Sequence, residues 1–265
     1  MELSGKTALL TGATGGLGVA IAHSLASRGA TLILSSRTPD ALEELRASLP
    51  GTGHRAIVNE LSEAGAAVAL VAEAGPVDIL VANAALPASG KLDEFSHDEL
   101  ERALRVNLEA PIRMAREVIP SMQARGGGHI VLIASLSARV ASIRASVYSA
   151  TKFGLRGFGL ALRQDLHDDG IGVSVVLPGF VRDAGLFADS GAKTPLGLGT
   201  ASPQDVGEGV VRVIEKNKAE LYVASLQQRV LVAFAYLCPG LAGRAQRRGG
   251  TRIADEIVAG QAGKR

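Results

Sequence analysis

The sequence predicts a doubly wound α/β fold, in which helices cover both faces of a mostly parallel, seven-stranded sheet. Seven short apolar runs alternate with longer segments whose apolar residues recur at helical spacing. The runs are apolar at nearly every position, as in parallel strands that are buried on both faces. The 265 residues contain no internal repeat and no long linker, so we expect a single domain.

The expected strands follow one another at residues 7–11, 31–36, 55–58, 78–84, 129–135, 172–178 and 220–224. After the first two strands, residues 17–29 and 41–49 have the apolar spacing of helices. Strands that alternate with helices in this way pair in parallel through right-handed crossovers.

The composition predicts an aliphatic core and limits the kinds of site. Hydrophobic residues make up 47% of the chain, whereas aromatic residues make up 3% and tryptophan is absent. The one cysteine, Cys238, excludes an intrachain disulfide and a cysteine-based metal site. The five histidines share no metal-ligand spacing, so we expect no metal. The amino terminus enters a strand pattern directly, so we expect no signal peptide. We also expect a cytoplasmic protein, which the single cysteine fits, and no nucleic-acid partner.

The turn after the first strand has the composition of a phosphate-binding turn. Gly12, Gly16 and Gly18 lie between an apolar strand and a helix. Glycines there permit a tight turn and close backbone approach to a phosphate, which the helix amino terminus faces. Because the strand precedes the turn and the helix follows it, cofactor binding is favoured over an ordinary tight turn.

A second stretch has the composition of a proton-transfer site. Tyr148 and Lys152 are spaced i, i+4, so a helix would place phenol and ammonium on one face. Ser135 ends the fifth strand, at the sheet edge where α/β proteins bind ligands. An ammonium about 4 Å from the phenol would lower the tyrosine pKa by roughly 3 from about 10, toward neutrality. The alternative is a surface helix with an incidental tyrosine and lysine.

Together these motifs resemble the short-chain dehydrogenase/reductase family. The glycine spacing is Gly-x-x-x-Gly-x-Gly, Asn83-Ala84-Ala85 follows the fourth strand, and Asn107, Ser135, Tyr148 and Lys152 come in the family's order. The resemblance extends from residue 7 to about residue 179 and implies a Rossmann-type fold that binds a nicotinamide dinucleotide.

The resemblance also implies roles for individual residues. Tyr148 would be the general acid/base, and Lys152 would bind the nicotinamide ribose and lower the tyrosine pKa. Ser135 would polarise the substrate carbonyl, and Asn107 would hold a water that links Lys152 to solvent. The implied cofactor-binding residues are Gly12, Thr14, Gly15, Gly16, Leu17, Gly18, Ser36, Arg37, Glu60, Leu61, Asn83, Ala84, Ala85, Tyr148, Lys152, Pro178, Gly179 and Val181.

The sequence departs from the family pattern at two positions. Ala85 replaces a usual glycine and adds a methyl group near the cofactor. After Pro178-Gly179, Asp183 replaces a threonine or serine that would contact the nicotinamide amide, although Val181 can offer its backbone.

Pro111 lies four residues after Asn107 in a segment that otherwise has helical spacing. A proline within a helix cannot bond the carbonyl at i−4, which here belongs to Asn107. We hypothesise that Pro111 kinks this helix and opens the Asn107 carbonyl to a water of the proton relay. The alternative is that Pro111 begins a second helix.

The end of the second strand bears on the choice of cofactor. Ser36 and Arg37 stand where an enzyme that prefers NAD usually has an aspartate, and an arginine would bind the 2′-phosphate of NADP. Gly15 lacks the basic side chain that many NADP enzymes of the family carry there. NADP(H) is favoured over NAD(H), with Arg37 on a solvated surface as the alternative. Glu60 and Leu61 stand where the family places an aspartate near the adenine.

The last third of the chain is expected to determine specificity. Residues 184–202, with Leu186, Phe187, Leu196 and Leu198, are predicted to form a lid that closes over the substrate. Residues 226–265 are predicted to form an apolar, then basic, helical extension. Residues 244–265 carry six basic and two acidic residues, +4, against −2 for residues 1–243. A membrane surface, an acidic partner such as acyl carrier protein, a pocket wall and a subunit interface all suit it.

These features predict an NADP(H)-dependent oxidoreductase that transfers a hydride between nicotinamide and the carbonyl or alcohol group of a lipophilic substrate. A ketone, a steroid-like compound and a 3-oxoacyl thioester all fit, and we expect a homo-oligomer, a dimer or tetramer. The alternatives are an NAD(H)-dependent alcohol dehydrogenase of the same family, a non-catalytic dinucleotide-binding scaffold, and a methyltransferase with a similar sheet.

Overall fold

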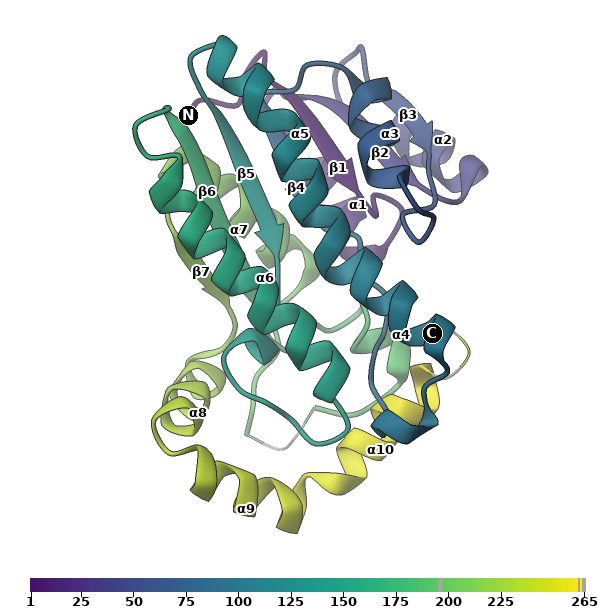
Figure 1. Cartoon of the computed structure of the whole chain (residues 1–265), viewed down its shortest axis with the longest axis vertical. Helices are drawn as coiled ribbons and strands as arrows, with labels where there is room; N and C mark the ends of the chain where they lie inside the picture. The colour runs from purple at the N-terminus through teal and green to yellow at the C-terminus, as the bar shows by residue number, and fades with distance from the viewer. Residues whose placement is uncertain (195–196, 262, 264–265) are drawn as a thin grey trace.

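The computed structural model describes residues 1–194, 197–261 and 263, and its centre is a seven-stranded parallel sheet (Figure 1). The strand order is β3-β2-β1-β4-β5-β6-β7, and every neighbouring pair is parallel. The strands are β1 Thr7–Thr11, β2 Thr31–Ser36, β3 Arg55–Val58, β4 Ile79–Ala82, β5 Gly128–Ile133, β6 Ile171–Pro178 and β7 Glu220–Val223. The predicted doubly wound fold is confirmed.

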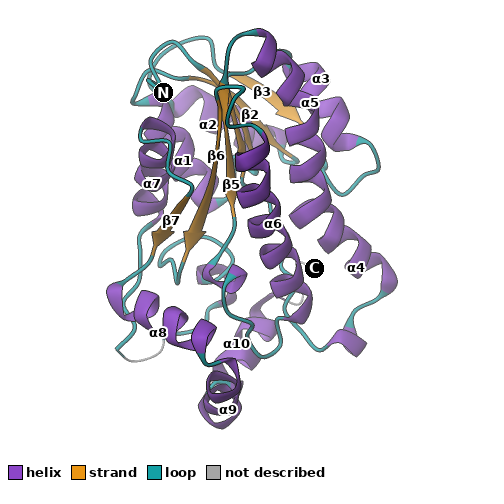
Figure 2. Cartoon of the chain, turned by 60° about the vertical axis from the view of Figure 1, so that its left-hand side comes forward, coloured by secondary structure: helices purple, strands orange, loops and turns teal. Residues whose placement is uncertain are grey.

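Helices cover both faces of this sheet. They are α1 Gly16–Ala26, α2 Pro39–Ser48, α3 Ala66–Ala74, α4 His97–Leu104, α5 Ala110–Ala124, α6 Ser146–Asp165, α7 Pro203–Glu215, α8 Leu226–Leu237, α9 Pro239–Gly249 and α10 Thr251–Gln261. Short helical turns lie at η1 Leu92–Glu94, η2 Arg105–Glu109, η3 Leu136–Ala138 and η4 Ala188–Ser190. Figure 2 shows α1 and α7 on one side of the strands and α3, α5 and α6 on the other.

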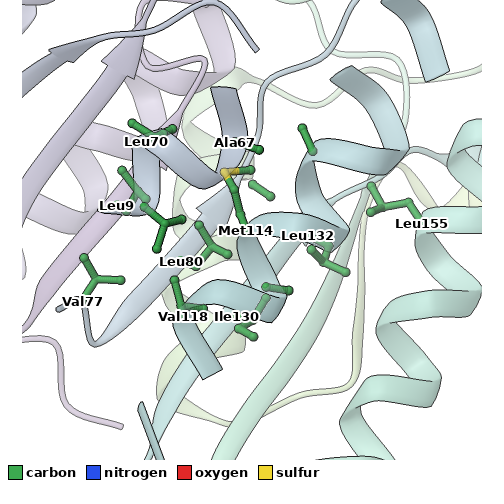
Figure 3. Close-up of a cluster of buried hydrophobic side chains, with 14 of the residues drawn as sticks. Leu9, Ala67, Leu70, Val77, Leu80, Met114, Val118, Ile130, Leu132 and Leu155 are labelled. Carbon is green, nitrogen blue, oxygen red and sulfur yellow. The ribbon is translucent and has the colours of Figure 1, made fainter. Parts of the chain in front are cut away.

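The strands are apolar throughout because each face of the sheet has its own buried core. Successive side chains of a strand point to opposite faces, so Leu9 joins the core under α3, α5 and α6. Ala8 and Leu10 join the core under α1, α2 and α7. Figure 3 shows part of the first core, in which Met114 of α5 packs among strand side chains such as Leu80. The two cores are aliphatic, as the composition predicts.

Pro111 does not begin a separate helix, because the backbone stays helical from α4 through η2 into α5. It lies in the first turn of α5, and the residues before it, η2, form a π-helical turn. The N–H of Ala110 there donates to the carbonyl of Arg105, five residues back. The wider turn accommodates a residue that has no N–H to donate. Whether the Asn107 carbonyl receives a water stays a prediction.

The carboxyl-terminal helices form an arc beyond the carboxyl ends of the strands. In Figure 1 the arrowhead of β5 points toward this arc, in which α8, α9 and α10 follow one another. The Ser225 hydroxyl begins α8 by accepting a hydrogen bond from the Gln228 N–H at 3.2 Å. In the described part of the chain, every helix is too short or too polar to cross a bilayer.

Candidate active site

A cavity of about 970 Å³ lies at the carboxyl ends of the strands, between the sheet and the arc. It reaches from the turn after β1 to α10. The chain changes direction across the sheet between β1 and β4, and α/β folds bind ligands at such a point. The predicted site residues that line the cavity are Gly12, Thr14, Gly15, Gly16, Leu17, Gly18, Ser36, Arg37, Glu60, Leu61, Asn83, Ala84, Ala85, Ser135, Tyr148, Lys152, Pro178, Gly179 and Val181.

The glycine turn has the geometry of an anion site. Gly12 has φ +62°, and a Cβ there would lie 2.8 Å from the Ala84 Cα. A Cβ on Gly18 would overlap the carbonyl oxygen of Gly12, so α1 packs directly on the turn. The amino terminus of α1 has neither a capping side chain nor an acidic residue in its first turn. Its N–H groups therefore fit a dinucleotide pyrophosphate.

Asn83 joins the ends of the two central strands. Its side-chain amide donates to the carbonyls of Thr11 and Gly12, at 3.0 and 3.1 Å. The Thr11 hydroxyl in turn accepts from the N–H groups of Asn83 and Ala84, each at 3.1 Å. These bonds fix the glycine turn relative to the Asn83-Ala84-Ala85 segment.

The end of β2 presents polar groups at the side of the cavity where the adenosine of the predicted cofactor would bind. The hydroxyls of Thr14 and Ser36 lie 2.6 Å apart. The Arg37 guanidinium is 3.7 Å from the Glu60 carboxylate and is 58% exposed, so it can reach a phosphate. Burial raises the pKa of Glu60, but hydrogen bonds from Ser62 and the charge of Arg37 outweigh it and lower that pKa.

Ser135, Tyr148 and Lys152 meet in the same cavity. Ser135 follows β5, and its hydroxyl accepts a hydrogen bond from the Ser137 N–H at 3.1 Å. Tyr148 and Lys152 occupy the first two turns of α6, as their spacing predicts. The Lys152 ammonium donates to the Ile133 carbonyl at 3.1 Å and lies 5.6 Å from the centre of the Tyr148 ring.

The electrostatics correct one expectation. Burial raises the pKa of Tyr148, and a hydrogen bond with Ser135 lowers it by a smaller amount. Burial also lowers the pKa of Lys152 to about 8. The pKa of Tyr148 in this structure therefore lies above its ordinary value and not nearer neutrality, as was predicted, because desolvation of the phenol outweighs the Ser135 hydrogen bond.

Asn107 is the predicted residue that does not line the cavity. It is fully buried, and its side-chain oxygen accepts from the Leu86 N–H at 2.7 Å while its amide donates to the Leu86 carbonyl at 2.9 Å. Both polar atoms of the side chain thus hold the loop after β4. A water of the relay would have to bind the main-chain carbonyl of Asn107.

The segment after β6 is braced by a residue that sequence reasoning missed. Gln228 of α8 is 2% exposed; its side-chain oxygen accepts from the Phe180 N–H at 3.1 Å, and its amide donates to the Gly199 carbonyl. A Cβ on Gly179 would overlap this amide. No local pattern marks Gln228, because its partners lie 29 and 48 residues away.

Asp183, the departure from the family pattern, does not enter the cavity. Its carboxylate pairs with Arg182 at 3.4 Å, and its side chain is 74% exposed. Val181 does line the cavity and pairs with Ala201 in an isolated parallel bridge.

The predicted lid lies between the glycine turn and the arc. A Cβ on Gly16 would overlap the Ala184 side chain, so the start of this segment packs on the turn. At the other side, the Gln261 amide of α10 donates to the Leu186 carbonyl at 2.9 Å. Residues 195 and 196 of the expected lid, Leu196 among them, lie outside the described residues.

The arc also binds the loop that leads into α6. The side-chain amide of Gln246 donates to the Ala141 carbonyl at 3.1 Å, and its oxygen accepts from the Ile143 N–H at 3.2 Å. Arg144 pairs with Asp255 of α10 at 3.0 Å. The predicted pocket wall is therefore present: α8, α9 and α10 complete the cavity from the side opposite the sheet.

Fold and site together define an α/β protein of the dinucleotide-binding type. The model of the short chain dehydrogenase family matches residues 6–194. The chain therefore belongs to this family, and its class is that of NAD(P)-dependent oxidoreductases that act on alcohol and carbonyl groups.

Similar proteins include enzymes of this class. Ketoacyl reductase HetN of Nostoc is 37% identical over 83% of this chain and 79% of its own. D-beta-hydroxybutyrate dehydrogenase of Rhizobium meliloti is 34% identical over 66% of this chain and 71% of its own. The structure of L-sorbose reductase from Gluconobacter frateurii, complexed with NADPH and L-sorbose, superimposes with a TM-score of 0.76 and 26% identity. It covers 84% of this chain and 97% of its own.

Proposed function

We propose that this protein is an NADP(H)-dependent oxidoreductase that interconverts a carbonyl and an alcohol group on a lipophilic substrate. The observation that carries the proposal is the shared cavity, in which Ser135, Tyr148 and Lys152 face the same space as the glycine turn. A scaffold without a reaction would have no need to hold a serine, a phenol and an ammonium beside a nucleotide site.

The residues of the trio divide the acid–base work. A nicotinamide bound in this cavity would supply or accept the hydride. Tyr148, whose pKa is raised by burial, holds its proton at neutral pH and is therefore suited to protonate the substrate oxygen during reduction. Ser135, already hydrogen-bonded with Tyr148, would donate to that oxygen and stabilise its developing charge. For oxidation, Tyr148 must first lose this proton, which favours higher pH.

The lining of the outer part of the cavity supports a lipophilic substrate. The side chains that α8 contributes there are Leu231, Val232, Phe234 and Ala235, besides Gln228. The glutamine is occupied by backbone partners. Apolar walls of this kind bind the apolar part of a ligand, while a few polar groups orient its reacting end.

Preference for NADP(H) rests on Arg37. A 2′-phosphate would be attracted by this guanidinium, and the loose pair with Glu60 at 3.7 Å can open for it. The same carboxylate could instead receive a ribose hydroxyl, which keeps an NAD(H)-dependent enzyme as the second candidate.

The test of cofactor choice is Arg37→Asp, with Kd measured for NADPH and NADH. We expect NADPH binding to weaken at least about 10-fold while NADH binding holds or improves. Arg116→Asp, at an 82% exposed position on α5, is the control and should change neither. Unchanged NADPH affinity in Arg37→Asp would refute the assignment.

The test of the reaction is a panel of aliphatic ketones, cyclic ketones and 3-oxoacyl thioesters with NADPH. Tyr148→Phe should lower kcat by about 100-fold or more and leave NADPH affinity within a few-fold. Tyr236→Phe, an exposed position of α8 that does not line the cavity, should keep full activity. If Tyr148→Phe turns over as fast as the parent, the assigned chemistry is wrong. Gel filtration of the parent protein would test the expected dimer or tetramer.

A further inference from the structure

Helix α8 is apolar on the side that faces away from the protein as well as on its inner side. Its inner residues Val232 and Ala235 are buried. On the outer side Leu226, Val230 and Leu237 are 71%, 61% and 77% exposed. These three follow at i, i+4 and i+11, so they form one stripe along the helix. An exposed apolar stripe of this kind marks a surface that contacts another protein or a membrane.

The apolar exposure is concentrated rather than scattered. Of the twelve large hydrophobic residues that are exposed in the described chain, seven lie between residues 226 and 241. Phe234 lies beside the stripe, and Leu241 of α9, the next helix, is 55% exposed. We refer to Leu226, Val230, Phe234, Leu237 and Leu241 as the α8–α9 surface. Figures 1 and 2 show α8 and α9 at the end of the molecule, beyond the sheet.

The chain segment that carries this surface has charge of one sign. Residues 221–254 contain five arginines and neither an acidic residue nor a lysine. Arg244 and Arg248 lie three and seven residues after Leu241 on α9 and are exposed, so they share its side of the helix. The two acidic residues that follow, Asp255 and Glu256, pair with Arg144 and Arg252.

We propose that the α8–α9 surface docks on an anionic lipid bilayer and lies in its interface. An apolar stripe bordered by arginines matches the acyl chains and the negatively charged headgroups. Two copies of this chain that met through the same surface would bring like-charged arginines together, which disfavours self-association. An acidic protein would match the arginines but leaves the extent of exposed apolar side chains less well explained. Since no described helix can cross a bilayer, the contact is peripheral.

Docking would place the opening of the cavity against the bilayer. Leu231 and Phe234 are 51% and 49% exposed, and both also line the cavity. They therefore stand at its rim, and Phe234 belongs both to the cavity lining and to the α8–α9 surface. A lipophilic substrate dissolved in the membrane could enter past them without crossing water. This part of the inference rests on the proposed function, whereas docking itself does not.

The experiment is vesicle flotation of the full-length protein. Vesicles of phosphatidylcholine alone are compared with vesicles that also contain phosphatidylglycerol. We expect the parent to float with the anionic vesicles, and less so at high salt. Leu226→Ser/Val230→Ser/Leu237→Ser should reduce the bound fraction at least 5-fold. Arg244→Gln/Arg248→Gln should reduce it on anionic vesicles and leave the weak binding to neutral ones unchanged.

The controls separate docking from folding and from catalysis. Leu92→Ser/Leu104→Ser removes exposed apolar side chains elsewhere, at 60% and 44% exposure, and should float like the parent. Tyr148→Phe should also float like the parent, so an error in the proposed chemistry would not affect this result. NADPH binding and the melting temperature of each variant report that it is folded.

Three outcomes would overturn the proposal. One is that the parent does not float with anionic vesicles, or that the triple-serine variant floats as well as the parent. Another is light scattering that shows a dimer in the parent and a monomer in the triple variant, with no vesicle binding by either, which would assign the surface to a second copy. Binding to an acidic carrier protein without binding to vesicles would refute it equally.

Discussion

Lys152 shows how strongly burial governs this site at the scale of one residue. Its side chain is 2% exposed, and its ammonium has the Ile133 carbonyl as a hydrogen-bond acceptor. Burial therefore lowers the pKa from 10.5 to about 8. Between about pH 8 and pH 10.5, Lys152 is protonated in the unfolded chain and deprotonated in the folded chain. Stability contributed by this group thus rises as the pH rises from about 8 to about 10.5.

We predict that Lys152→Met stabilises the fold while it abolishes activity. Below pH 8 the variant no longer desolvates a charge, so its free energy of unfolding should increase by up to about 3 kcal/mol. The gain should fade as the pH approaches 10.5. Urea unfolding at several pH values measures it. Lys216→Met, at an exposed position after α7, is the control, and a loss of stability in Lys152→Met at pH 7 would contradict the argument.

The sequence predicts which residues form the site more readily than it predicts their protonation states. The spacing of Tyr148 and Lys152 correctly places both in one cavity with Ser135, because i, i+4 spacing is a local property of a helix. The sequence predicted a lowered pKa for Tyr148, whereas the structure raises it, because desolvation depends on every chain segment that packs around the phenol. Asn107 illustrates the same limit, since its partner Leu86 lies 21 residues earlier.

At the scale of elements, α1 depends on the close approach of its first turn to the turn after β1. A Cβ added at Gly18 would overlap the carbonyl oxygens of Gly12 and Ala13. Both obstacles are backbone atoms that the adjacent strand holds in place, so the helix itself would have to move.

We predict that Gly18→Ala shifts α1 and impairs the nucleotide site. The free energy of unfolding should fall by about 1–3 kcal/mol, as for other overpacked sites, and NADPH affinity should fall at least about 10-fold. Gly157→Ala in α6 is the matched control, because a Cβ there meets no atom within 4 Å. That variant should be more stable by about 0.5–1 kcal/mol. Thermal melts and NADPH titration measure both, and equal behaviour of the two variants would refute the steric argument.

The strands were predictable element by element because burial on both faces leaves a continuous apolar run. All seven strands form within a few residues of the expected ranges. The π-helical turn before Pro111 was not predictable in detail, since a proline is compatible with a kink, a new helix or a widened turn. The contacts of α10 with the predicted lid have no local sequence pattern either.

At the scale of the whole molecule, the cavity is a composite of the sheet and the arc. The loops after the strands, together with α6, carry the predicted nucleotide-binding and reacting groups, and the arc supplies the outer wall. On α9 that wall is made of small side chains, Ala242, Ala245 and Gly249, with Gln246 between them. Small residues leave space beyond the reacting groups, which suits a substrate with an extended apolar chain.

We predict that Ala245→Phe shortens the range of accepted substrates. With NADPH, kcat/KM for methyl nonyl ketone should fall at least about 10-fold, while kcat/KM for butanone stays within about 2-fold. Leu241→Phe, on the exposed side of α9, is the control and should affect neither ketone. Equal losses for both ketones would show that Ala245 does not limit chain length.

The brace formed by Gln228 has a practical consequence for protein engineering. Its side chain belongs to the carboxyl-terminal segment, but its partner Phe180 precedes the predicted lid and its partner Gly199 lies within it. A chimera that exchanged the final forty residues with those of a homologue would thus disturb a loop far upstream of the junction. In such a chimera, residues 179–199 should be exchanged together with residue 228.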